Sequence, residues 1–123
     1  MIFVAGIILV AIGFVHSYLG ERCILMRLFK RDNLPHLFGS DHFTKGTLRF
    51  CWHVMSLAAF GFAAILFHVP SHNRFTLSTI GIVFLCSASL SAYFTKGRHL
   101  SWIAFLTIAI LCFAELCGES YGI

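Results

Sequence analysis

The sequence predicts an all-α integral membrane protein, built as an up-down-up-down four-helix bundle. Of its 123 residues, 59% are hydrophobic and only 11% are charged, and its mean hydropathy is +0.87. A soluble domain usually carries about a quarter charged residues, so this chain has too little charge to cover a water-exposed surface. Its length is typical of one domain, and we expect residues 1–123 to form a single transmembrane domain.

Four apolar runs are long enough to cross a bilayer as helices. A helix needs roughly 20 residues to span a hydrocarbon core of about 30 Å, and each run is near that length. A chain this short cannot close a transmembrane barrel, which leaves helices as the spanning element. The predicted spans cover about residues 2–19, 48–67, 75–94 and 100–116, and helix is expected to continue from the first span through Leu28.

The connections between the apolar runs differ in length. Residues 29–47 form a substantial loop that contains Pro35, Gly39 and Gly46, whereas residues 68–74 and 95–99 form short turns. Short connections place consecutive helices side by side and antiparallel. This pattern predicts the up-down-up-down topology.

Basic residues gather on one side of the predicted bundle. Eight of the nine Lys and Arg residues lie in or beside the first loop and the third connection, and only Arg74 lies opposite. Positive charge is retained in the cytoplasm, so we expect a cytoplasmic loop at 29–47 and both termini outside, in the periplasm. The basic residues are therefore read as topology signals, and no nucleic-acid partner is expected. Four of them are predicted to contact the headgroups of the lipid bilayer, namely Arg27, Lys30, Arg31 and Lys45.

Ionisable residues inside the spans are the candidates for function, because they are costly in a membrane. His16 in the first span and His53 in the second are expected at similar depth, since these spans are antiparallel. Small residues border both histidines at helical spacing and indicate close approach of the helices, so the two rings should face a neighbouring helix rather than lipid. They are Gly6, Gly13 and Gly20 in the first span, and Ser56, Ala59 and Ala63 in the second. Glu21 is better placed to meet Arg49, or another span, than His16 on its own helix.

Polar side chains from every span or connection are predicted to gather near the cytoplasmic face. The cluster comprises His16, Ser17, Glu21, Arg49, His53, Ser91, Thr95 and His99. Imidazoles with a carboxylate can bind a transition metal, so His16, His53, His99 and Glu21 are the candidate metal ligands, and two imidazoles on facing helices could hold a haem. No HxxxH, ExxH or CxxC spacing selects a ligand. A hydrogen-bonded cluster that only fixes helix register therefore stays open.

Short motifs accompany these histidines. They are HSYLGER at the end of the first span, Trp52-His53 in the second, and Gly97-Arg98-His99 before the fourth. With this layout the chain resembles small four-span bacterial inner-membrane proteins of uncharacterised activity. The resemblance implies an inner-membrane location and emphasises His16, Glu21, His53 and His99. It implies no activity.

Three functions are consistent with these observations. The first is a transporter or channel that handles an ion, a proton or a metal through the His/Glu cluster, as a homo-oligomer, because four spans enclose little interior. The second is a redox protein that binds haem or a metal, and the third is a non-enzymatic module that binds lipid or a partner. Hydrolytic chemistry is disfavoured, because the sequence contains no nucleophile–base motif.

Overall fold

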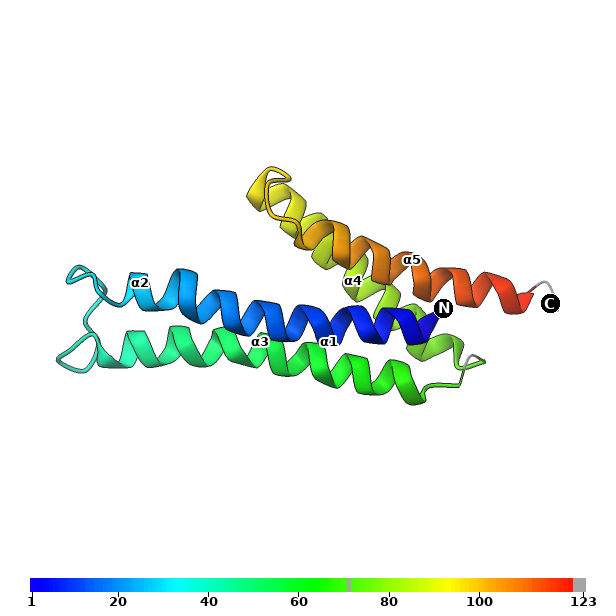
Figure 1. The fold of residues 1–123 in the computed structure, drawn as a ribbon, viewed down its shortest axis with the longest axis horizontal. Helices are drawn as coiled ribbons and strands as arrows, with labels where there is room; N and C mark the ends of the chain where they lie inside the picture. The colour runs from blue at the N-terminus through cyan, green and yellow to red at the C-terminus, as the bar shows by residue number, and fades with distance from the viewer. Residues whose placement is uncertain (71, 121–123) are drawn as a thin grey trace. The chain divides into compact units, whose positions relative to one another are not determined.

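The computed structural model describes residues 1–70 and 72–120, and within them the chain is all-α with four long helices (Figure 1). This confirms the predicted fold class. The elements are α1 (Ile2–Leu19), continued by the π-helical turn η1 (Gly20–Leu25) and by α2 (Met26–Leu28), then α3 (His42–His68), α4 (Arg74–Thr95) and α5 (Ser101–Ser120).

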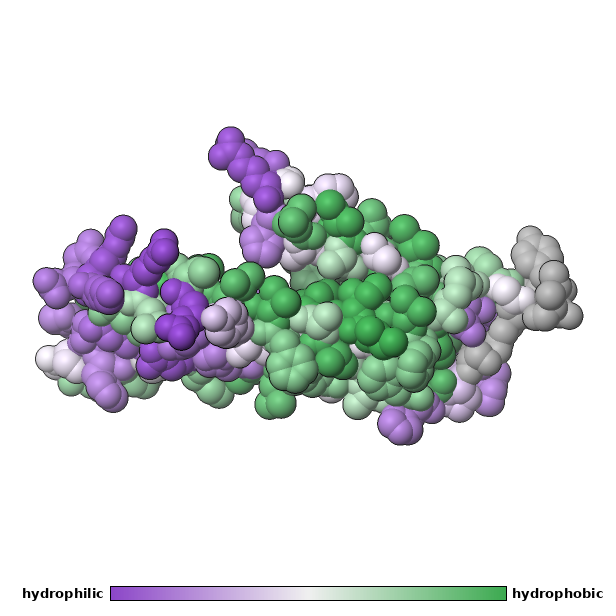
Figure 2. All heavy atoms as spheres, viewed as in Figure 1, coloured by the Kyte–Doolittle hydropathy of each residue, from purple (hydrophilic) through white to green (hydrophobic). Residues whose placement is uncertain are grey.

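Each long helix is apolar enough to cross a membrane. The four candidate spans are Ile2–Leu28, His42–His68, Arg74–Thr95 and Ser101–Gly118, with 27, 27, 22 and 18 residues. Hydrophobic side chains cover the middle of the α1–α3 hairpin, and hydrophilic ones gather at its loop end (Figure 2). The protein is therefore a small multi-pass membrane protein.

The turn chemistry explains where α4 begins and ends. Asn73 caps its first turn, because the Asn73 side chain accepts a hydrogen bond of 3.1 Å from the backbone N–H of Thr76. At the other end Lys96 and Gly97 adopt positive φ angles of 51° and 74°, which stop the helix. The two short turns thus lie where the sequence predicts them.

The first connection is shorter than predicted, because α3 begins at His42 rather than near Leu48. The backbone C=O of Asp41 accepts the N–H of Lys45, and the Asp41 carboxylate pairs with the Lys45 ammonium at 2.7 Å. These bonds stabilise a polar first turn that precedes the apolar part of α3. The apolar run predicts the position of the span, but it does not predict the polar residues that extend α3 toward its start.

The chain divides into two compact units. The first unit is Leu9–Gly61, and the second is Met1–Ile8 together with the chain from Phe62 onward. In the second unit, ring contacts join the end of α3 to α4 (Phe62–Phe84, 5.6 Å) and α4 to α5 (Phe84–Phe105, 5.6 Å). A third contact, Phe3–Phe67 at 5.0 Å, joins the start of α1 to the end of α3. Within this unit, ring contacts thus join α1 to α3, α3 to α4, and α4 to α5.

Glycine at every seventh residue of α1 and its continuation receives an aromatic ring from α3. A Cβ atom added at any of these glycines would overlap the ring that it faces. The pairs are Gly6 with Phe67, Gly13 with Phe60, and Gly20 with Trp52. Close approach through small residues is the predicted mode of packing, and these contacts confirm it, since helix association in lipid depends on tight van der Waals contact.

Candidate functional site

The candidate site lies in the first unit, between α1–η1 and α3. Ser17 and Glu21 are four residues apart on one side, and Arg49 and His53 are four residues apart on the other. Residues at this spacing share one face of a helix, so each pair presents its side chains together. Because the helices run antiparallel, the two pairs meet.

A π-helical turn occurs at this point of the first span. The backbone N–H of Met26 donates to the C=O of Glu21, five residues earlier instead of four. Such a turn inserts one extra residue into the helix, and π turns are frequent at functional sites. The helical periodicity of the sequence follows 3.6 residues per turn and does not predict this π turn.

Glu21 accepts hydrogen bonds from two side chains of α3. The Arg49 guanidinium donates through Nη2 to Oε1 at 2.7 Å and through Nε to Oε2 at 3.2 Å, and His53 Nε2 lies 3.2 Å from Oε2. Arg49 also lies over the ring of Phe29, 5.0 Å from its centroid. The predicted meeting of Glu21 with Arg49 is confirmed, and His53 joins it.

The second nitrogen of His53 faces Ser17. Its Nδ1 is 2.6 Å from the Ser17 Oγ. Since Arg49 is permanently charged and pairs with Glu21, the carboxylate acts as acceptor and His53 Nε2 carries a hydrogen. In neutral His53 the Nδ1 atom is then the acceptor, and the Ser17 hydroxyl donates to it. Arg49, Glu21, His53 and Ser17 thus form one continuous chain of hydrogen bonds.

His16 makes a separate set of contacts in the same unit. Its Nδ1 is 2.9 Å from Oγ of Ser56, which is only 4% exposed. The Trp52 indole N–H donates to the backbone C=O of His16 at 3.0 Å, and the two rings stack with centroids 4.8 Å apart. Both predicted histidines therefore face a neighbouring helix. Sequence reasoning placed Ser56 on the correct face and did not identify it as a partner of His16.

The remaining predicted cluster residues lie in the second unit. Ser91 Oγ is 2.6 Å from Ser101 Oγ across α4 and α5, and Ser101 Oγ is 2.8 Å from Nδ1 of His99. Thr95 donates to the C=O of Ser91 at 2.6 Å. Ser101 was missed by sequence reasoning, although its position two residues after His99, at the start of a helix, is typical of a capping residue. That all eight residues form one cluster stays a prediction.

Metal ligands do not converge within the part of the chain that the structure describes. Among residues 1–70 and 72–120, no group of three or more His, Cys, Asp or Glu side chains is close enough to hold a metal ion. The Glu21 and His53 side chains are adjacent, and His16 and His99 make the separate contacts described above. The assignment of these four residues as metal ligands stays a prediction.

The residues predicted to contact headgroups lie in and beside the connection between α2 and α3. Hydrophilic side chains gather at this loop end of the first unit (Figure 2). Arg27, Lys30 and Arg31 are exposed, whereas Lys45 is half-buried and paired with Asp41. The hydrogen bond from Lys45 holds the pKa of the Asp41 carboxyl below its ordinary value, against a smaller opposing effect of desolvation. The headgroup prediction therefore covers three exposed cations and one cation that pairs with a carboxylate.

Comparison of the chain with protein-family models, with curated proteins and with solved structures finds no match.

Proposed function

We propose that this protein handles protons in the membrane, and that the Glu21–His53 pair is the group that binds and releases them. The observation that carries the proposal is the hydrogen-bonded chain from Arg49 through Glu21 and His53 to Ser17. Four polar groups in a membrane-spanning hairpin are costly unless they are paired, and such residues mark ion and proton sites. Histidine adds a side chain that changes its charge near neutral pH.

Proton uptake at His53 would change every bond in this chain. In the neutral ring Nδ1 accepts from Ser17, so it is the atom that takes the proton. The Ser17 hydroxyl must then rotate and accept from Nδ1–H instead of donating. The imidazolium also competes more strongly with Arg49 for Glu21, because both are then cations. Protonation would thereby alter the contact that joins η1 to the first part of α3.

The proposed transport form is a homo-oligomer. Four spans per chain enclose little interior, so a proton path across the membrane would be completed between copies of the chain. Chemical cross-linking in native membranes followed by mass measurement tests this part. Discrete dimers or larger rings support it, and a monomer at every cross-linker concentration contradicts it.

Proton flux into liposomes tests the function directly. Purified protein is reconstituted with an internal pH dye, and a potassium gradient with valinomycin drives the flux. We expect the wild-type rate to exceed that of empty liposomes at least fivefold, and His53→Gln and Glu21→Gln to fall to the empty-liposome rate. Ser89→Ala is the matched control, because this exposed hydroxyl on α4 bonds the C=O of Leu85 within its own helix.

A second measurement tests the protonation of His53 independently of proton flux. In ¹⁵N-histidine spectra, the His53 ring should show one hydrogen on Nε2 at high pH and a second on Nδ1 after acidification. In Glu21→Gln the amide can donate as well as accept, so hydrogen should appear on either ring nitrogen of neutral His53. An unchanged hydrogen position in Glu21→Gln, or wild-type liposomes as tight as empty ones, contradicts the proposal.

We also propose an inner-membrane location with the 29–41 connection in the cytoplasm and both termini in the periplasm. The support is the distribution of Lys and Arg. In a cysteine-free background, His72→Cys should react with an impermeant maleimide in intact cells, and Lys30→Cys only after permeabilisation. If Lys30→Cys reacts in intact cells and His72→Cys reacts only after permeabilisation, the protein has the opposite orientation.

Headgroup binding belongs to the same proposal. Each exposed cation near an anionic membrane surface contributes about 1 kcal/mol. Replacing Arg27, Lys30 and Arg31 by Gln should therefore weaken retention of anionic lipid during purification, while Lys45→Gln should matter less, because Lys45 pairs with Asp41. Equal lipid content in both variants contradicts the assignment.

A further inference from the structure

The hydrogen-bonded chain from Arg49 ends on the hydroxyl of Ser17, and this arrangement favours a second chemical function besides proton binding. Glu21 contacts one ring nitrogen of His53 at 3.2 Å, and Ser17 contacts the other at 2.6 Å. A carboxylate that orients an imidazole, which in turn accepts the proton of a hydroxyl, is the arrangement that activates a serine nucleophile. We propose that Ser17 is a nucleophile that accepts acyl groups from acyl esters of the membrane.

The tautomer of His53 is the one that this chemistry requires. Glu21 holds a hydrogen on Nε2, so the Nδ1 lone pair faces the hydroxyl of Ser17. In most serine hydrolases Nε2 of the histidine accepts the serine proton and Nδ1–H donates to the carboxylate. In this protein Nδ1 faces the hydroxyl and Nε2 faces the carboxylate, so the two nitrogens have exchanged roles. Arg49 keeps the carboxylate in place from the opposite side.

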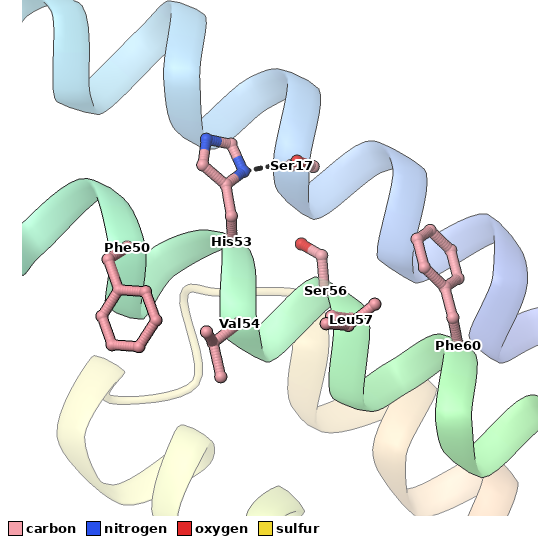
Figure 3. Close-up of a pocket in the computed structure, with 7 residues that line it drawn as sticks. All are labelled: Ser17, Phe50, His53, Val54, Ser56, Leu57 and Phe60. Atoms are coloured by element: carbon pink, nitrogen blue, oxygen red, sulfur yellow. Dashed lines mark hydrogen bonds between the residues drawn. The ribbon is translucent and has the colours of Figure 1, made fainter.

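A pocket of about 360 Å³ lies beside Ser17, within the first unit (Figure 3). This volume is within the range of small-molecule sites. Its polar part consists of Ser17, His53 and Ser56, and its apolar part of Phe50, Val54, Leu57 and Phe60 from α3. The close-up shows Ser17 bonded to His53 between Phe50 on one side and Phe60 on the other.

The apolar part of the pocket indicates the class of substrate. Phe50 and Leu57 are 65% and 67% exposed, so the pocket opens on a face of α3 that belongs to a membrane-spanning helix. A pocket lined by apolar side chains of a membrane span favours molecules that are dissolved in the bilayer. A molecule that enters it carries a hydrocarbon chain for the apolar side chains and a polar carbonyl for Ser17, which describes an acyl ester.

The acyl transfer can be written with its atoms balanced. The Ser17 Oγ forms a bond to the ester carbonyl carbon while His53 Nδ1 takes the hydroxyl proton. The tetrahedral adduct then breaks its bond to the original alcohol oxygen, and that alcohol leaves with the proton from Nδ1. The acyl group remains on Ser17 until water or a second alcohol reverses the steps.

Ser56 is the hydroxyl available for the negative charge of the tetrahedral adduct. It is buried, it lines the same pocket, and His16 Nδ1 lies 2.9 Å from its Oγ. When His16 carries its hydrogen on Nδ1, Ser56 accepts that bond and its own hydrogen can point into the pocket. A donor placed where charge develops stabilises the adduct.

Labelling with a long-chain alkyl fluorophosphonate tests this activity on the full-length protein in lipid nanodiscs. We expect one adduct, located at Ser17 by peptide mass spectrometry. The rate should fall at least 100-fold in His53→Gln, since base catalysis contributes about 10²–10⁴-fold. A short-chain fluorophosphonate should react more slowly than the long-chain one, because it does not occupy the apolar part of the pocket. Ser89→Ala should react as the wild type.

Several outcomes overturn the proposal. They are no adduct on the wild type, an adduct at another residue, or an equal labelling rate in His53→Gln. Elution volume and tryptophan fluorescence verify that each variant is folded. Acyl transfer and proton handling are separable: an unlabelled protein with normal proton flux overturns the acyl-transfer proposal alone, whereas a labelled protein without flux overturns proton handling alone.

Discussion

Replacing Gly20 with alanine should destabilise the α1–α3 hairpin. Gly20 is buried, and a Cβ atom at this position would overlap the indole ring of Trp52. The indole cannot move without cost, because it donates to the C=O of His16 at 3.0 Å and stacks on the His16 ring. The added methyl group therefore acts on the candidate site as well as on packing.

The magnitude follows from three effects. Overpacking costs about 1–3 kcal/mol, and loss of the Trp52 hydrogen bond costs about 0.5–1.5 kcal/mol. Against these, alanine favours a helix over glycine by about 1 kcal/mol. The free energy of unfolding should therefore fall by roughly 2 kcal/mol.

Gly46→Ala is the matched control. Gly46 lies in α3, and a Cβ atom there meets nothing within 4 Å. This variant should be as stable as the wild type or up to about 1 kcal/mol more stable. Reversible unfolding by SDS in mixed micelles, followed by tryptophan fluorescence and circular dichroism, measures both. If Gly20→Ala proves as stable as Gly46→Ala, the ring-against-glycine explanation is refuted.

Three further predictions concern polar contacts. Arg49→Glu and Glu21→Arg should each weaken the hairpin against SDS unfolding, and the double exchange should recover part of the loss; no recovery contradicts a direct pair. Ser91→Ala should cost about 0.6–1.7 kcal/mol of unfolding free energy, because it removes a bond between helices, whereas Ser89→Ala should be neutral. The pKa of Asp41 is lowered in the folded chain, so its stabilisation of the first turn of α3 is present at neutral pH and lost as the pH falls through that pKa. The protection of this turn against hydrogen exchange, measured relative to the intrinsic exchange rate at each pH, should therefore fall on acidification in the wild type, and Asp41→Asn should show no such pH step.

The sequence alone determined the four spans. Backbone polar groups have no water to bond in a bilayer, so an apolar run of about 20 residues must form a helix. The glycine spacing of the first span also predicted close packing with a neighbour, and the charges predicted the meeting of Glu21 with Arg49. These features depend on length, spacing and charge, which are visible along the chain.

Only the tertiary structure decided which partner each polar side chain has. Ser17 and His53 are 36 positions apart in sequence, and they meet because ring-against-glycine packing sets the register of two antiparallel helices. The register in turn decides which nitrogen of His53 faces the carboxylate and which faces the hydroxyl. The π turn after Leu19 and the polar first turn of α3 also arise from hydrogen bonds that no apolar pattern records. Apolar runs therefore determine that the helices span the membrane, and the contacts between helices determine what chemistry their polar residues can perform.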